Sequence, residues 1–320
     1  MSCCGALSML RPAPPPPASE PAARRPPPDT DLADMVRVDS GVFLMGYDGP
    51  DTFLDDGEGP VREVTLSPFL VDATAVSNAQ FESFVLATGY VTDAESAGWS
   101  FVFHRLLHPA AKPCVQDVRL PEAPWWLAVD QANWRQPEGP GSDLNGRADH
   151  PVVHVSWRDA SSYAVWRGRR LPTEAEWECA ARGGLARARY PWGDDLRPGG
   201  EHRCNLWQGR FPDIDTAEDG FAGTCPVGAF APNALGLFNM AGNVWEWCSD
   251  WWSPFHHFDD CTSTRRDPHG PPAGSDKVIR GGSYLCHAAY CNRYRVSARH
   301  HNGVTASTGH MGFRCAADAD

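Results

Sequence analysis

Two cysteines in the C-terminal part of the chain, Cys286 and Cys291, are close enough in the sequence to form a reactive site together. They lie in the segment 281–295, which reads GGSYLCHAAYCNRYR. Side chains five positions apart in a regular strand point to opposite faces, so the chain must bend if the two sulfurs are to meet. The residues alone leave three outcomes open: a disulfide, two independent core thiols, or a site with two thiolates.

A site with two thiolates suits a soft metal ion of low coordination number, and Cu(I) is the natural choice. Structural zinc would need a second matching pair of ligands, and no such pair follows in the sequence. Twelve histidines are scattered over the chain, so His287, His300 and His301 are weak candidates for metal ligands.

The overall composition indicates which classes of partner and which cellular compartment to expect. The 28 basic and 40 acidic residues give a net charge of −12, which disfavours binding to nucleic acid or an anionic membrane. No apolar run approaches the roughly 20 residues of a membrane span, and the first residues lack the features of a secretory signal. An odd number of cysteines, eleven, argues against a disulfide framework. We therefore expect a cytoplasmic protein.

The elements that must position these cysteines form one domain. Residues 1–34 are rich in proline and almost free of large apolar residues, so we predict a disordered tail there. Residues 35–320 contain no second low-complexity linker and are predicted to form a single domain.

Three helices are indicated by capping-box spacing at their first residues. The first follows Ser77 and ends at Gly89, the second follows Ser156 and runs through Trp166, and the third follows Thr173 and ends before 183–184. Most of the 30 Gly, 29 Pro and 13 Trp lie elsewhere, with short β-like runs at 41–45, 61–66 and 278–281. This pattern predicts an α+β fold rich in irregular loops, which buried tryptophans and bound cations would order.

Several motifs carry a resemblance to a known family. The segment 281–295, followed by GFRCAAD at 312–318, resembles the C-terminal signature of formylglycine-generating enzymes. Four further segments agree and occur in the family's order: GVFLMG at 41–46, HPVVHVSW at 150–157, RLPTEAEWE at 170–178 and NMAGNVWEW at 239–247. The Cys286 and Cys291 pair is the most specific of these features.

The resemblance implies a bacterial-type member of the sulfatase-modifying factor family, with a C-type-lectin-like fold of low regular secondary structure. It implies Cu(I) held by Cys286 and Cys291, with Ser283 and Trp245 as active-site neighbours. The implied substrate is an unfolded sulfatase with a Cys-x-Pro-x-Arg motif. Its cysteine would be converted to C-alpha-formylglycine, a post-translational modification that uses dioxygen and a reductant. We expect a monomer.

The resemblance also implies two structural calcium ions. The matching positions for the first ion are Asn205, Leu206, Asp219 and Phe221, and those for the second are Asn239, Gly242, Val244 and Glu246. Side-chain oxygens from the Asn and acidic residues, together with backbone carbonyls, form the ligand mixture that calcium prefers.

The sequence departs from the family in two places. After the arginine that matches Arg299, many relatives continue Asn-Thr-Pro-Asp-Ser-Ser, whereas the segment 300–307 reads HHNGVTAS here. The sequence therefore does not predict which peptides the protein prefers. The positions of structural disulfides in secreted members hold Ala164, Ala181 and Val296, which leaves Cys315 without a partner.

The main alternative is a catalytically silent relative that binds sulfatase peptides, and retention of both Cys286 and Cys291 argues against it. An iron-dependent member would carry a His-x3-His-x-Glu motif, which the sequence lacks.

Overall fold

The structure, a computed structural model, describes residues 32, 34–39 and 41–319. The predicted disordered tail therefore lies outside the described residues, except for Leu32 and Asp34. Asp34 forms an ion pair with Arg169 at 2.5 Å, and the first strand begins one residue later at Met35. The contact of Asp34 ties the start of the described chain to the domain.

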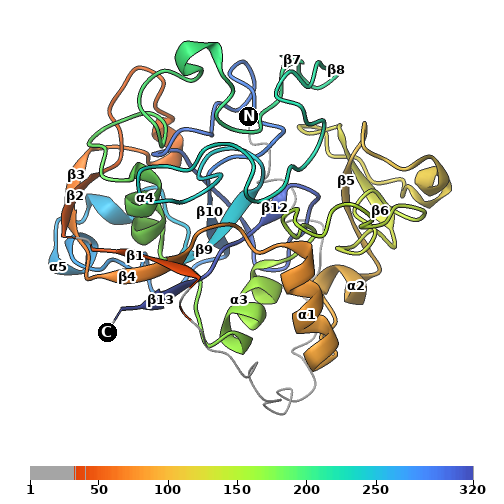
Figure 1. Cartoon of the computed structure of the whole chain (residues 1–320), viewed down its shortest axis with the longest axis horizontal. Helices are drawn as coiled ribbons and strands as arrows, with labels where there is room; N and C mark the ends of the chain where they lie inside the picture. The colour runs from red at the N-terminus through yellow and green to blue at the C-terminus, as the bar shows by residue number, and fades with distance from the viewer. Residues whose placement is uncertain (1–31, 33, 40, 320) are drawn as a thin grey trace.

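A four-stranded sheet lies at the centre of the fold, and a three-stranded sheet and three two-stranded ribbons lie around it (Figure 1). The four-stranded sheet has the order β11-β10-β9-β12, in which β9 and β12 are parallel and the other neighbours are antiparallel. Its strands are β9 (Trp245–Trp251), β10 (Asp276–Arg280), β11 (Arg299–Gly303) and β12 (Met311–Gly312). This sheet carries two predicted site residues, Trp245 and Glu246, at the first two positions of β9.

The second sheet has three strands in the order β1-β4-β13 and joins the two ends of the described chain. These strands are β1 (Met35–Val38), β4 (Phe69–Asp72) and β13 (Ala316–Asp318). The ribbons pair β2 (Val42–Met45) with β3 (Arg62–Thr65), β5 (Trp99–Phe103) with β6 (Trp126–Asp130), and β7 (Gly209–Arg210) with β8 (Ile214–Asp215). The predicted β-like runs at 41–45, 61–66 and 278–281 thus overlap β2, β3 and β10.

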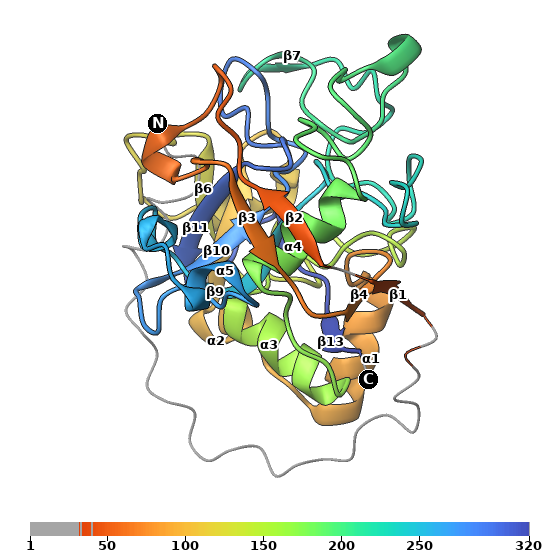
Figure 2. The same cartoon turned by 90° about the vertical axis from the view of Figure 1, so that its left-hand side faces the viewer.

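The three predicted helices are confirmed as α1 (Asn78–Thr88), α3 (Trp157–Trp166) and α4 (Glu174–Arg182). Each begins with the expected capping box, in which the N-cap hydroxyl of Ser77, Ser156 or Thr173 accepts a backbone N–H. Helices α1 and α3 lie side by side at one end of the molecule in both views (Figures 1 and 2). The sequence analysis missed the short helices α2 (Asp93–Ala97) and α5 (Thr262–Arg265).

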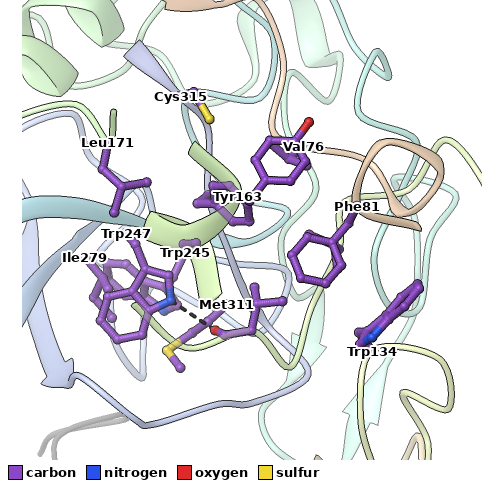
Figure 3. Packing of buried hydrophobic residues seen from close by; sticks show 14 of the residues in the cluster. Val76, Phe81, Trp134, Tyr163, Leu171, Trp245, Trp247, Ile279, Met311 and Cys315 are labelled. Carbon is purple, nitrogen blue, oxygen red and sulfur yellow. Dashed lines mark hydrogen bonds between the residues drawn. The ribbon is translucent and has the colours of Figure 1, made fainter. Parts of the chain in front are cut away.

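The largest buried cluster joins the helices to the four-stranded sheet, and Figure 3 shows part of it. Trp245 and Trp247 of β9 are fully buried in this cluster, and the indole N–H of Trp247 donates to the carbonyl of Val155 at 3.1 Å. Cys286 and Cys291 belong to the same cluster. Burial of this much aromatic surface stabilises a fold with little regular secondary structure.

The observed architecture confirms the predicted α+β fold with low regular secondary structure. The longest helix of the described residues, α1, has 11 residues. In the described part of the chain, no helix has both the length and the apolar character needed to cross a membrane.

Candidate functional site

All four predicted catalytic residues line one small pocket. Ser283, Cys286 and Cys291 come from the loop after β10, and Trp245 comes from the start of β9. The remaining lining side chains are mostly aromatic: Trp125, Trp126, Phe211, Leu285, Tyr290 and His310. Trp245 and Cys291, which are 46 positions apart in the sequence, therefore line the same pocket.

Two successive turns bend the chain, one leading into Cys286 and one between Cys286 and Cys291. In the first turn, the backbone N–H of Cys286 donates to the carbonyl of Ser283 at 2.9 Å. In the second, the backbone N–H of Cys291 donates to the carbonyl of His287 at 3.0 Å. Both thiols are almost fully buried, at 2% and 1% exposure, and both border the pocket.

The two thiols form a donor set that fits Cu(I). The nine cysteines of the described residues form no disulfide, so the structure has the two cysteines as thiols. The backbone N–H of Ser283 lies 3.4 Å from Sγ of Cys286, which is a favourable contact for a thiolate. Buried sulfur ligands in an aromatic pocket suit a soft cation and would exclude harder ions.

Three aromatic rings form one wall of the pocket. The rings of Phe211 and Tyr290 stack with centroids 4.1 Å apart, and Trp125 meets both edge-on at about 5 Å. Phe211 and Tyr290 were not connected with the site from the sequence alone. No local pattern links these two residues, because they come from separate loops.

His310 is a pocket residue that the sequence analysis did not single out. Its Nδ1 lies 2.5 Å from Oγ1 of Thr308, and its ring packs against Trp126 with a centroid distance of 4.6 Å. Burial lowers the pKa of His310 to about 3, so the imidazole is neutral at physiological pH. Its carbonyl also accepts the backbone N–H of Trp245 at 2.9 Å, which fixes β9 against this residue.

The altered segment 300–307 lies beside the pocket. The His300 ring lies 5.9 Å from the ring of Trp245. His301 turns to the other side, where Nδ1 lies 2.9 Å from the carboxylate of Asp276. His287, in the cysteine loop, uses Nδ1 to accept the backbone N–H of Ala289 at 3.2 Å.

The four residues expected at the first calcium site converge around one carboxylate. Asp219 accepts the backbone N–H of Leu206 at 3.0 Å and that of Phe221 at 3.0 Å. Oδ1 of Asn205 is fully buried and has no hydrogen-bond donor in the structure. A buried oxygen without a donor fits a cation ligand. The structure adds Gln208, whose amide contacts both Asp219 at 2.8 Å and the carbonyl of Leu206.

In the second expected calcium set, the carboxylate of Glu246 already has other partners. Oδ1 of Asn239 is buried without a hydrogen-bond donor, which fits a cation. Glu246 accepts two hydrogen bonds from Arg314 and one from the indole of Trp177, at 2.7–2.8 Å. A carboxylate has about four acceptor positions, so one remains for a metal ion. Gly242 packs tightly here, because an added Cβ would lie 2.3 Å from the carbonyl oxygen of Asn205.

The fold and the pocket define a loop-rich α+β protein with two buried thiols at an aromatic site. Residues 21–319 match the sulfatase-modifying factor enzyme 1-like domain. A formylglycine-generating enzyme of Thermomonospora curvata is 63% identical, over 89% of this chain and 93% of its own length. One from Streptomyces coelicolor is 58% identical, over 89% of each chain.

Two further similarities concern an inactive relative and the fold. The inactive C-alpha-formylglycine-generating enzyme 2 of Mus musculus is 46% identical, over 89% of this chain and 86% of its own length. The solved structure of PvdO from Pseudomonas aeruginosa has a TM-score of 0.62 at 24% identity, covering 89% of this chain and 94% of that one. At this identity, the match with PvdO shows the fold alone. The chain belongs to the sulfatase-modifying factor enzyme 1-like family, which confirms the resemblance stated from its motifs.

Proposed function

We propose that this protein is an oxidoreductase that uses copper and dioxygen to convert a cysteine into C-alpha-formylglycine. The proposed substrate is an unfolded sulfatase carrying a Cys-x-Pro-x-Arg motif. The observation that carries the proposal is the shared pocket of Ser283, Cys286, Cys291 and Trp245. The names of the closely similar relatives from Thermomonospora curvata and Streptomyces coelicolor support the formylglycine product.

The side chains of this chain would have separate tasks in such a reaction. Cys286 and Cys291 would hold Cu(I), which supplies dioxygen activation when it is bound. The backbone N–H of Ser283 points at Sγ of Cys286 and would stabilise negative charge on that sulfur. Trp245 lies fully buried at the pocket floor and would keep water away from the reacting sulfur.

The aromatic wall supports a peptide as the substrate. Phe211, Tyr290 and Trp125 present ring surface at the pocket, and rings of this kind bind apolar peptide side chains at a low entropic cost. The substrate cysteine must leave its own chain's interior to reach two buried thiols, so an unfolded segment suits the site. We propose that the protein acts in the cytoplasm as a monomer, with calcium in the two loops.

The conversion requires an external reductant in addition to dioxygen. One peptide thiol, one dioxygen and two reductant thiols would yield the aldehyde, hydrogen sulfide, a reductant disulfide and water, which balances atoms and electrons. The peptide would lose about 18 Da, a value that follows from this stoichiometry for an oxidation at a metal site.

The second candidate is a catalytically silent protein that binds sulfatase peptides. The inactive relative from Mus musculus supports this second candidate, because its similarity extends over most of this chain. The two buried thiols in one pocket argue against it, since peptide binding alone does not require them.

A peptide assay separates the two candidates. Copper-loaded protein, a thiol reductant and air should convert a Cys-x-Pro-x-Arg peptide, with the mass loss seen by mass spectrometry. Cys286→Ala and Cys291→Ala should each abolish turnover, whereas Cys248→Ala, at an equally buried cysteine of β9 away from the pocket, should retain it. Peptide binding without any mass change would replace the oxidase by the silent binding protein.

A further inference from the structure

Arg293 connects the site loop to a segment far away in the sequence. Its Nη1 donates a long hydrogen bond, 3.5 Å, to the carbonyl of Cys291, and its Nε donates to the Asp56 carboxylate at 2.6 Å. The two side chains of the ion pair are only 7% and 12% exposed. Charge-assisted hydrogen bonds are strong and directional when they are removed from water. Asp56 therefore fixes the orientation of the guanidinium that contacts the Cys291 backbone.

A second arginine, two residues further along the chain, makes a similar arrangement. Arg295 donates from Nε to the carbonyl of Asn292 at 3.0 Å, and it makes a bidentate pair with Glu58 at 2.5 and 2.7 Å. Neither side chain of this pair is exposed to solvent. Asn292 has a φ of +46°, in the left-handed region, so its conformation needs support from its surroundings. Glu58 provides that support through Arg295.

Residues 51–58, which we call the strap, contain both carboxylates and a ring that packs on both arginines. The Phe53 ring centre lies 4.3 Å from the guanidinium of Arg293 and 5.5 Å from that of Arg295. Such contacts between cations and aromatic rings add to the ion pairs and restrict sliding of the arginines. The carboxylate of Asp51, at the start of the strap, also accepts the Asn292 amide at 3.4 Å.

The strap is itself held in place from its other side. Nη1 of Arg299, in β11, donates to the carbonyls of Asp56 and Gly57 at 3.1 and 3.2 Å. Gly57 has a φ of +66°, and an added Cβ would lie 2.2 Å from the carbonyl oxygen of Pro254. The strap thus has little freedom to move away from the cysteine loop.

Cys286 is held by a different part of the molecule. Its carbonyl accepts the backbone N–H of Trp207, and the neighbouring Tyr284 donates its own backbone N–H to Asn243 at 2.9 Å. Trp207 and Asn243 lie in the loops of the expected calcium sites. The two thiols of the site are therefore positioned by two separate supports.

We propose that Asp56, Glu58 and Phe53 of the strap are positioning residues for Cys291. They act through Arg293 and Arg295 and set where the second thiol lies relative to Cys286. The role in metal binding rests on the proposed function, whereas the role in holding the Cys291 segment does not.

The test compares Asp56→Asn with Asp72→Asn, a matched change at another buried carboxylate. Asp72 pairs with Arg169 and has the same 12% side-chain exposure as Asp56, but it lies in β4, away from the site loop. Full-length protein, reduced and free of copper, is treated with iodoacetamide, and the labelling rate of each cysteine is followed by mass spectrometry. Labelling of a buried thiol requires local opening, so the rate measures how firmly each segment is held.

Asp56→Asn should accelerate labelling of Cys291 about tenfold and leave Cys286 within about twofold of the unsubstituted protein. It should also weaken Cu(I) binding about tenfold in a competition titration, as loss of a supporting contact commonly does. Asp72→Asn should leave both properties unchanged. Equal acceleration at both cysteines, or an unchanged rate at Cys291, would overturn the proposal.

The test also covers a variant that does not fold and a protein that binds no Cu(I). If Asp56→Asn does not fold, Phe53→Leu keeps both ion pairs and should still accelerate labelling of Cys291 selectively, by about threefold; labelling like that of the unsubstituted protein would overturn the proposal. If the unsubstituted protein binds no Cu(I), the proposed function fails, and the labelling rates still decide whether the strap holds Cys291.

Discussion

The backbone N–H of Trp207 donates a hydrogen bond to the carbonyl oxygen of Cys286, across 3.2 Å. Trp207 directly follows Asn205 and Leu206, two of the expected calcium ligands. Its ring packs against Phe211, which lines the pocket, with centroids 5.3 Å apart. Trp207 therefore belongs to the loop of the first expected calcium site and also supports the backbone of Cys286.

This contact predicts that removal of calcium weakens copper binding without abolishing it. Chelation should free the loop of Asn205 and Asp219, lower the melting temperature by several degrees, and reduce Cu(I) affinity by about threefold to tenfold. Calorimetry and a Cu(I) competition titration, each with and without a calcium-selective chelator, would measure the two effects.

The control for calcium removal is Asp219→Asn, which should abolish most of the response to the chelator. Asp213→Asn, at an exposed acid near the same loop, should respond like the unsubstituted protein. Protein that contains no calcium by elemental analysis and shows no thermal shift with chelator would contradict the expected sites.

Loss of the His310 side chain should affect the peptide more than the metal. The neutral imidazole borders the pocket and packs against Trp126, so His310→Ala would open a space where the peptide should lie. We expect KM for a Cys-x-Pro-x-Arg peptide to rise about tenfold with a smaller change in kcat, which is the signature of lost uniform binding. Steady-state kinetics on copper-saturated protein would measure this change.

His301→Ala is the matched control for the His310 variant. His301 is a histidine of the altered segment 300–307. It pairs with Asp276, and its ring stacks on Trp252 with centroids 4.6 Å apart. It does not line the pocket described above. Similar kinetics in the two variants would contradict a specific role of His310 at the peptide site.

The sequence predicted the elements whose signals are local. The capping boxes of α1, α3 and α4 each involve residues three positions apart, so they could be recognised without knowing the fold. The two-thiol centre was also predictable, because Cys286 and Cys291 are close in sequence and their motif is specific.

The supports of the site could not be predicted in this way, because they join residues that are distant in the sequence. Asp56 and Arg293 are 237 positions apart, and Glu246 and Arg314 are 68 apart. Each of these residues, taken alone, is an ordinary charged residue in a loop or at a strand. Only the fold places them together in a buried pair, where the free energy of their interaction depends on exclusion of water.

Asp250 should make the stability of the fold depend on pH. This aspartate of β9 is 4% exposed and accepts the backbone N–H of Glu174 at 2.8 Å. Burial, followed by the nearby carboxylate of Glu174, raises the pKa of Asp250 to about 7. Proton binding by Asp250 therefore favours the folded state. That contribution is complete below about pH 4, where the unfolded chain is also protonated, and is lost as pH rises to about 7.

Asparagine resembles the protonated form of aspartate, so Asp250→Asn should change stability differently at different pH. The free energy of unfolding should be nearly unchanged at pH 4 and should increase by about 4 kcal/mol at pH 8, where the native protein must bury a charge or bind a proton. Urea unfolding of both proteins at pH 4, 6 and 8 measures the difference. Asp213→Asn, at an exposed aspartate, should give a difference that does not vary with pH in this way. A constant difference between Asp250→Asn and the unsubstituted protein would show that Asp250 is ionised in the folded state throughout this range.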